Sequence, residues 1–240
     1  MKGINKIYKL VSLSSRTIYP WVCCMCGGQK QTHIGVCHAC IMHLPWCFNE
    51  PLCSICGLPL AGSKSARTIC GICQHSPPYY DHIHANFWYQ APIDRLISDY
   101  KYQNQWQNAQ TLIDLSAVSL ANILKAGLVI PMPSHPMRIR QRGFNAVYEL
   151  IKLLSKKVTF NYELNAVIRS KNTDTQTGKL KPQRRKNVKG AFNIIKPLEY
   201  EHVIIFDEVV TTAATVNELS YCLKQAGIKR VTVCAIARTK

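Results

Sequence analysis

Residues 203–215 read Val203-Ile204-Ile205-Phe206-Asp207-Glu208-Val209-Val210-Thr211-Thr212-Ala213-Ala214-Thr215. Four apolar residues bounded by charge predict a buried strand of a parallel sheet that is covered on both faces. The residues that follow have Leu219, Leu223 and Ala226 at helical spacing and predict a helix that Gly227 ends. A strand, a loop of small residues and a helix start therefore follow one another, and this order indicates an α/β fold.

The loop between strand and helix contains the groups that bind a phosphate. Backbone N–H groups at a helix N-terminus point toward an anion, and the hydroxyls of Thr211, Thr212 and Thr215 add further donors. Asp207 and Glu208 offer acceptors for the paired hydroxyls of a ribose. This arrangement resembles the signature of type I phosphoribosyltransferases, which holds the ribose and 5′-phosphate of phosphoribosyl pyrophosphate. The alternative is an ordinary strand, turn and helix with a Thr cap.

One residue departs from that signature. Where the family commonly has Thr-Thr-Gly-Ala-Thr, this chain has Ala213 in the glycine position, followed by Ala214. We expect the methyl group of Ala213 to exclude a positive φ or to crowd the phosphate, and so to weaken or abolish binding.

The length and the cysteines predict two domains. A chain of 240 residues is long enough for one α/β domain and a smaller one. Ten of the twelve cysteines lie between Cys23 and Cys73, and this spacing stops before Ser76-Pro77-Pro78. We therefore place the boundary near Tyr80, with a cysteine-rich domain and its basic N-terminal helix over residues 1–79 and the α/β domain over residues 80–240.

Four Cys-x-x-Cys pairs predict zinc. They are Cys23 with Cys26, Cys37 with Cys40, Cys53 with Cys56, and Cys70 with Cys73. Each pair points two thiolates at one metal, and two pairs complete a tetrahedral site without an open position, which is typical of a structural site. Grouping the pairs in sequence gives two sites, but a cross-braced arrangement of first with third and second with fourth fits equally well. Cys24, Cys47 and His33 are left over.

The charge indicates a polyanionic partner. The formal net charge is +17, and residues 138–189 carry fourteen Lys and Arg against three acidic residues. A solvated basic face is the alternative. The sequence has no run of about 18 apolar residues and no secretory signal, so we expect a cytoplasmic protein, where repeated cysteine pairs bind metal.

The middle of the chain shows ordinary globular patterning. It predicts a strand at 87–89, helices at 93–100 and 106–124, and a buried strand at 128–130 that runs into Pro131-Met132-Pro133-Ser134-His135. A loop at the carboxyl end of a strand is where ligands bind in open α/β sheets.

The whole chain resembles the ComF (competence protein F) family, which includes GntX-like proteins. The resemblance rests on motifs in the family's order: the Cys-x-x-Cys pairs, Pro77-Pro78, Lys101-Tyr102, Pro131-Met132-Pro133, Arg138-Ile139-Arg140-Gln141-Arg142-Gly143-Phe144-Asn145, Arg169 with Thr173 and Gln176, Arg184 with Asn187, Ala191-Phe192, and the acidic-Thr loop. It implies a phosphoribosyltransferase-like domain with a zinc-binding N-terminal part, acting on incoming single-stranded DNA during natural transformation.

The resemblance also implies roles for single residues. Asp207 and Glu208 contact the ribose, residues 211–215 the 5′-phosphate, and the loop with Pro133, Ser134 and His135 the pyrophosphate, with Mg²⁺ bridging the ligand's oxygens. Phosphate or DNA contacts fall to the basic residues Arg138, Arg140, Arg142, Lys179, Arg184 and Arg185. Residues 173–189 are read as a loop that closes over the site, or else as a surface loop that never meets the ligand. Phe144 and Tyr148 are candidate stacking platforms for DNA bases. The alternative is that both side chains pack in the core.

Three functions remain open on the sequence. The first is a competence protein that handles single-stranded DNA and binds phosphoribosyl pyrophosphate. The second is an active phosphoribosyltransferase on a nucleobase or nucleotide, although the sequence offers no dedicated general base. The third is a zinc-ribbon adaptor with a vestigial site. The sequence does not distinguish a DNA-uptake helicase, a channel protein or a second copy of the chain as the protein partner.

Overall fold

The computed structural model describes residues 22–29, 32, 34–60, 68–171 and 188–240. The chain divides into two compact units, residues 1–44 and residues 45–240. The boundary that we placed near Tyr80 lies inside the second of these units. The basic helix expected at the N-terminus lies outside the described residues.

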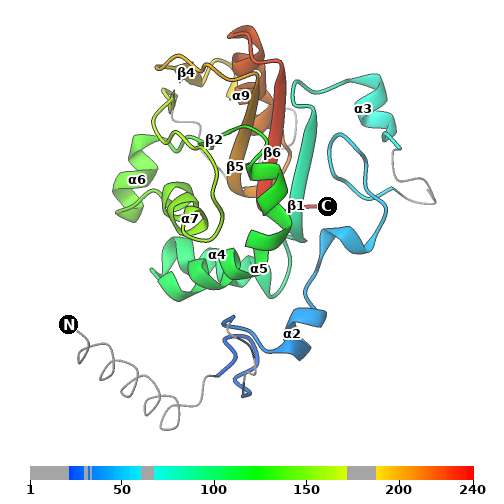
Figure 1. The fold of residues 1–240 in the computed structure, drawn as a ribbon, viewed down its shortest axis with the longest axis vertical. Helices are drawn as coiled ribbons and strands as arrows, with labels where there is room; N and C mark the ends of the chain where they lie inside the picture. The colour runs from blue at the N-terminus through cyan, green and yellow to red at the C-terminus, as the bar shows by residue number, and fades with distance from the viewer. Residues whose placement is uncertain (1–21, 30–31, 33, 61–67, 172–187) are drawn as a thin grey trace. The chain divides into compact units, whose positions relative to one another are not determined.

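A four-stranded sheet forms the centre of the second unit. Its order is β1-β6-β5-β2, and all neighbouring strands are parallel, with β6 between β5 and β1 (Figure 1). A separate ribbon pairs two short strands, β3 and β4, in antiparallel fashion. The strands are β1 (His82–Trp88), β2 (Leu128–Pro131), β3 (Val167–Arg169), β4 (Phe192–Ile194), β5 (His202–Val210) and β6 (Arg230–Arg238).

Helices flank this sheet. α5 packs on β6, α7 packs on β5 and β2, and α9 packs on β6 and β4. Leu219 and Leu223 of α9 join Ile205 and Val233 of the sheet in one buried cluster. The helices of this unit are α3 (Gly71–His75), α4 (Ile93–Tyr102), α5 (Trp106–Leu124), α6 (Pro136–Arg142), α7 (Ala146–Ser155) and α9 (Ala214–Gln225), with a short 3₁₀ turn η1 (Cys47–Asn49).

The fold class predicted from the sequence is confirmed: a mostly parallel sheet flanked by helices, preceded in the chain by two cysteine-rich hairpins. The helix predicted over 106–124 has those bounds in α5. The strand predicted over 203–206 is longer, because β5 keeps its pairing with β6 as far as Val210, which lies opposite Arg238. Among the described residues, no helix is long and apolar enough to cross a membrane.

The two cysteine-rich hairpins share one local structure. Gly27 N donates to Cys23 O over 2.9 Å, and Gly57 N donates to Cys53 O over 3.0 Å. Both glycines have positive φ, +70° and +65°, which favours a residue without a β-carbon. The second cysteine pair of each hairpin then lies at the start of a short helix, α2 (His38–Met42) in the first unit and α3 in the second.

The second hairpin is built into the core of the α/β unit. Ile83 N of the edge strand β1 donates to Ile55 O over 2.8 Å, and a Cβ placed on Gly57 would lie 2.8 Å from Ile83 O. The cysteines of this hairpin belong to the same buried cluster as β5 and β6. Covering an edge strand in this way removes unpaired backbone groups from solvent.

Candidate functional site

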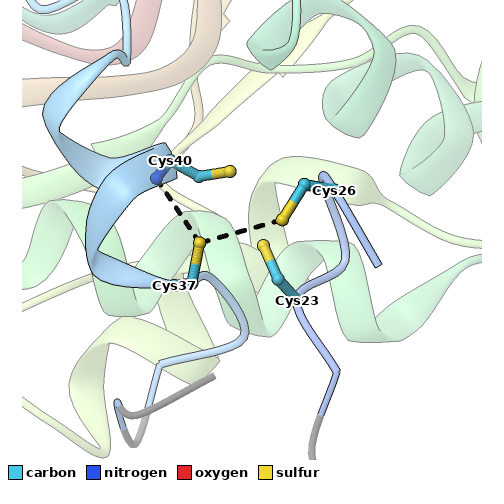
Figure 2. Close-up of side chains that lie close together, drawn as sticks. All are labelled: Cys23, Cys26, Cys37 and Cys40. Atoms are coloured by element: carbon cyan, nitrogen blue, oxygen red, sulfur yellow. Dashed lines mark hydrogen bonds between the residues drawn. The ribbon is translucent and has the colours of Figure 1, made fainter. Parts of the chain in front are cut away.

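The first four-cysteine cluster lies in the first unit. The sulfur atoms of Cys23, Cys26, Cys37 and Cys40 lie within 4.8 Å of one another. Figure 2 shows the four side chains converging, Cys23 and Cys26 from a loop and Cys37 and Cys40 from the start of α2, with Cys37 Sγ accepting from Cys40 N over 3.5 Å and lying 3.8 Å from Cys26 Sγ. Backbone N–H donors to sulfur favour the thiolate, which is the form that binds a metal.

The second cluster has the same composition. The sulfur atoms of Cys53, Cys56, Cys70 and Cys73 also lie within 4.8 Å of one another, and all but Cys70 are buried. Burial acts against a charged thiol, but N–H groups of Cys70, Cys56 and Ile55 outweigh it and lower the pKa of Cys53 to about 7. Four converging sulfurs fit a tetrahedral zinc ion, so both clusters suggest structural zinc.

The structure groups the cysteine pairs in sequence. The first and second pairs converge, as do the third and fourth, so the cross-braced alternative does not occur. Cys24, which is exposed, and Cys47, which is buried, belong to neither cluster, and His33 lies outside the described residues.

The stretch from Asp207 to Thr215 forms the end of β5, a short loop and the first turn of α9. Asp207 and Glu208 are both still in β5, Thr211 and Thr212 lie in the loop, and α9 begins at Ala214. The first N–H groups of a helix have no acceptor inside the helix, and they carry the positive end of its dipole. The strand, loop and helix order that the sequence predicts is present.

Ala213 takes the conformation expected of the glycine it replaces. Its φ is 59° and its ψ is 5°, in the left-handed region, and it precedes α9 without a side-chain cap. The methyl group therefore does not exclude a positive φ here, at a cost of roughly 1–2 kcal/mol for a non-glycine residue. Ala213 lines the cavity beside Asp207, so its methyl group lies where a bound phosphate would meet it.

Glu208 is held by a cation from another part of the chain. Lys101 Nζ on α4 lies 2.5 Å from Glu208 Oε1, and Glu208 is only 6% exposed. Burial opposes ionisation of Glu208, but the charge of Lys101 lowers its pKa to about 2. Asp207 behaves in the opposite way, because burial and then the Glu208 carboxylate raise its pKa well above the ordinary value. The pKa values of these two adjacent carboxyl groups are therefore shifted in opposite directions.

A cavity of about 260 Å³ joins these elements. Its wall includes both carboxylates, Lys101, and Thr211, Ala213 and Thr215 of the loop. Thr212 and Ala214 instead line a cavity of about 460 Å³, which Thr211 and Ala213 also reach. Arg169 at the end of β3 also lines it, and burial, followed by the charge of Arg138, lowers the pKa of Arg169 to about 10 while Asp207 acts in the opposite direction. The cavity thus combines two carboxylates, the hydroxyls of Ser134, Thr211 and Thr215, and three cations, Lys101, Arg138 and Arg169.

The loop after β2 contributes only part of what the sequence predicts. Pro133 and Ser134 line the cavity. His135 instead caps α6, since its Nδ1 accepts from Met137 N over 3.2 Å.

The three arginines of α6 separate into two groups. Arg138 lines both the cavity beside Asp207 and a neighbouring cavity of about 390 Å³, and Arg142 lines the second. Arg140 is exposed and lines neither. The remaining predicted basic contacts, Lys179, Arg184 and Arg185, lie outside the described residues, as does most of the expected closing loop at 173–189.

One aromatic residue lines the second cavity, and others follow it in the chain. Tyr102, 72% exposed, lines it, and the Arg142 guanidinium lies 5.4 Å from the Tyr102 ring centre. Trp106 is 46% exposed, and its ring packs on that of Phe144 with 4.6 Å between the ring centres. Phe144 is one of the two stacking residues predicted from the sequence. Tyr148 instead donates from its hydroxyl to Asn165 Oδ1 over 3.3 Å. The two most exposed aromatic rings here are thus Tyr102 and Trp106.

Comparison with known proteins gives the family. The double zinc ribbon domain matches residues 14–74. Competence protein F of Haemophilus influenzae is 30% identical over 228 residues, which cover 90% of this chain and 96% of that protein. The DNA utilization protein YhgH of Escherichia coli K12 is 30% identical over 227 residues, which cover 92% and 98%. This chain belongs to the ComF (competence protein F) family. The resemblance predicted from the sequence is confirmed.

Two solved structures show a distant likeness. A hypoxanthine phosphoribosyltransferase from Staphylococcus aureus matches with 14% identity and a TM-score of 0.31 over 54% of this chain and 62% of its own. A purine phosphoribosyltransferase from Pyrococcus horikoshii matches with 14% identity and a TM-score of 0.31 over 56% and 84%. Scores this low support no argument about function.

Sequence reasoning missed two residues of the site. Lys101 and Arg169 both occur in the family motifs quoted above, but nothing near them in the chain indicates that they approach Asp207 and Glu208. Only the packing of α4 and β3 beside the end of β5 brings them together.

Proposed function

We propose that the protein is a competence protein that handles incoming single-stranded DNA in the cytoplasm and binds phosphoribosyl pyrophosphate, or a related ribose phosphate, in the cavity at the end of β5. The names of its relatives, competence protein F and DNA utilization protein, support the DNA part. The observation that carries the ligand part is the cavity in which Asp207, the Lys101–Glu208 pair and the start of α9 meet.

The ligand's groups match those of the cavity. Asp207 and Glu208 accept hydrogen bonds from the ribose hydroxyls, and the loop at residues 211–215, of which Thr211, Ala213 and Thr215 line this cavity, binds the 5′-phosphate through its N–H groups and hydroxyls. Pro133 and Ser134 lie on the pyrophosphate side, where Arg138 and Arg169 supply positive charge. Mg²⁺ bridging phosphate oxygens belongs to the same proposal.

The neighbouring cavity is where we place the DNA. It shares Lys101, Ser134, Arg138 and Glu208 with the first cavity, so the two adjoin. Arg138 and Arg142 bind the backbone, and the exposed ring of Tyr102 stacks on a base, with the exposed ring of Trp106, four residues further along the chain, as a second platform. A phosphate contact is electrostatic, whereas stacking is insensitive to salt.

A salt titration of oligonucleotide binding tests this placement. In fluorescence anisotropy with a labelled single-stranded oligonucleotide, the double variant Arg138→Gln/Arg142→Gln binds at least about 10-fold more weakly at low salt. The slope of log K against log salt becomes smaller by roughly 1 to 2, because each lost phosphate contact on a single strand accounts for about 0.7.

Arg140→Gln is the matched control, since it removes the same charge from the same helix but away from both cavities. It leaves affinity and slope near the wild-type values. Equal losses in the control and the double variant would show that only net charge matters and would overturn the placement of DNA in this cavity.

One observation favours a second function, that of an active phosphoribosyltransferase. The cavity of about 390 Å³ beside Glu208 has room for an acceptor base next to the ribose. If the protein transfers ribose 5-phosphate, it releases pyrophosphate when given phosphoribosyl pyrophosphate, Mg²⁺ and the acceptor. Ligand binding without pyrophosphate release across the nucleobases and single-stranded DNA would leave the DNA-handling function alone.

A further inference from the structure

Arg238 is a buried cation that the proposed function does not use. It is the last residue of β6 and only 3% exposed. Its backbone pairs with Val210 of β5 on one side and Trp88 of β1 on the other. Within the described part of the chain, neither Nε nor Nη1 has a hydrogen-bond acceptor. Burying a charge without a partner is costly, so Arg238 requires a source of negative charge nearby.

The second four-cysteine cluster lies beside this side chain. Arg238 lines a cavity of about 460 Å³ together with Cys56 and Cys73. A Cβ placed on Gly57, which follows Cys56, would lie 3.9 Å from Arg238 Cδ. Burial lowers the pKa of Arg238, and the groups that act in the opposite direction are the Tyr80 phenol followed by the Cys56, Cys47 and Cys73 thiols.

A loaded zinc site supplies the missing charge. Four thiolates around one Zn²⁺ leave a net negative charge on the sulfur atoms, which accept N–H donors and attract a cation. The one carboxylate among the residues that line this cavity, Glu218, is engaged elsewhere, because its Oε1 accepts from Gly190 N over 2.6 Å. Thr211 and Thr212 of the loop line the same cavity. Of the two four-cysteine clusters, only the second lies in the same unit as Arg238.

The position of Arg238 also connects the zinc site to the phosphate-binding loop. Val210, its partner in the sheet, directly precedes Thr211, and Thr239 N donates to Val210 O over 3.0 Å. On the other side of the same cavity, Tyr79 N donates to Asn217 Oδ1 of α9 over 2.8 Å. The end of β6 therefore lies between the zinc hairpin and the start of the loop.

We propose that Arg238 is the charge partner of the second four-cysteine zinc site and that it joins zinc binding at this site to the geometry of the loop at residues 211–215. Arg238 is thus a positioning residue, acting through the zinc site and the strand ends. This role goes beyond the proposed function and holds whichever ligand the loop takes.

Pulsed alkylation of cysteines during challenge with a chelator tests the proposal in the zinc-loaded full chain. Mass spectrometry follows each cysteine separately, so the first cluster serves as an internal control. In Arg238→Met, the four cysteines of the second cluster become labelled about 10-fold or more faster than in wild type, as expected for loss of a residue that supports metal ligands. The first cluster keeps its wild-type rate.

Two further variants separate charge from packing. Arg238→Lys keeps the charge and retains most of the protection of the second cluster. Lys240→Met removes a neighbouring cation that pairs with Glu50 over 2.7 Å, and it behaves as wild type. Should Arg238→Met not fold, Arg238→Lys decides: second-cluster labelling within about twofold of wild type supports the proposal, and loss of protection contradicts it.

Amide hydrogen exchange supplies the readout for the loop. In Arg238→Met, exchange at residues 210–216 increases while α5 remains protected. Second-cluster labelling at the wild-type rate in Arg238→Met, or an equal acceleration at both clusters, would overturn the proposal. Faster labelling with unchanged exchange in the loop would overturn its second part, the link to residues 211–215.

Discussion

The two four-cysteine clusters have the same ligands and the same hairpin, but they differ in what surrounds them. The first lies in a small unit where a Cβ on Gly27 would meet no atom within 4 Å, and Cys26 is exposed. The second is buried against β1, with Gly57 pressed against Ile83 O. The same set of four cysteines therefore has two structural settings: the first cluster organises its own hairpin, and the second is part of the core on which the loop at residues 211–215 rests.

We expect the largest effect when one cysteine ligand is removed from each cluster in turn. Cys73→Ser unfolds the second unit, because the apparent binding energy of a structural zinc, about 10–16 kcal/mol, is as large as the roughly 5–15 kcal/mol stability of a domain. Cys40→Ser leaves the second unit folded. Hydrogen exchange in β5 and β6 measures both. A similar loss of protection in the two variants would remove the distinction between the clusters.

A substitution in the cavity at the end of β5 lowers the stability of the second unit without changing either cysteine cluster, and so separates the contribution of this cavity from that of zinc. Lys101→Met leaves the buried Glu208 without its cation and costs about 3–5 kcal/mol at pH 7, measured by urea unfolding. The folded pKa of Glu208, about 2, lies below its ordinary value of 4.5, so the ion pair stabilises the fold above pH 4.5. The difference between wild type and variant therefore shrinks as the pH falls from 4.5 toward 2. A difference independent of pH would exclude the ion pair as its cause.

The two knuckle glycines form a matched pair. Gly57→Ala and Gly27→Ala both place a side chain at positive φ, which costs roughly 1–2 kcal/mol. Only Gly57→Ala also drives a methyl group into Ile83 O, which adds about 1–3 kcal/mol. The midpoint temperature of thermal unfolding of the second unit is therefore lowered by Gly57→Ala and unchanged by Gly27→Ala. Equal effects would mean that the second hairpin is not held against β1.

The smallest effect is expected at Ala213. Ala213→Gly changes stability by no more than about 1 kcal/mol, because relief of the left-handed conformation is offset by the greater freedom of glycine in the unfolded chain. Ligand affinity increases several-fold if the methyl group crowds the phosphate. Ala214→Gly, one residue into α9, is the control and lowers stability without tightening binding. Unchanged affinity in Ala213→Gly would show that the methyl group does not obstruct the site.

The sequence predicts local features well and non-local ones poorly. The strand, loop and helix at 203–215, the helix at 106–124 and the four Cys-x-x-Cys pairs are all local patterns. The grouping of the cysteine pairs stays open because spacing alone permits two arrangements. Lys101 meets Glu208 across more than one hundred residues, and no periodicity encodes that approach.

The environment of the second hairpin is likewise non-local. The cysteine spacing ends near Ser76 and predicts a domain boundary near Tyr80, which stays a prediction, and the structure adds that the second hairpin packs into the same buried cluster as β5 and β6. The hydrogen bond from Ile83 N to Ile55 O and the close approach at Gly57 decide this, and both are tertiary contacts. Similarly, no local pattern around Arg238 indicates that it lies beside the second cluster, where the structure places it.

Calorimetry with phosphoribosyl pyrophosphate and Mg²⁺ tests most directly whether the cavity at the end of β5 binds this ligand. We expect micromolar binding at one site in the zinc-loaded wild-type protein and loss of binding in Asp207→Asn. That variant stays folded, because burial and Glu208 already raise the pKa of Asp207 and a neutral side chain removes the repulsion. Asp114→Asn, which breaks an ion pair with Lys157 away from the cavity, binds as wild type. No binding to the wild-type protein, or equal binding to Asp207→Asn, would contradict the central claim.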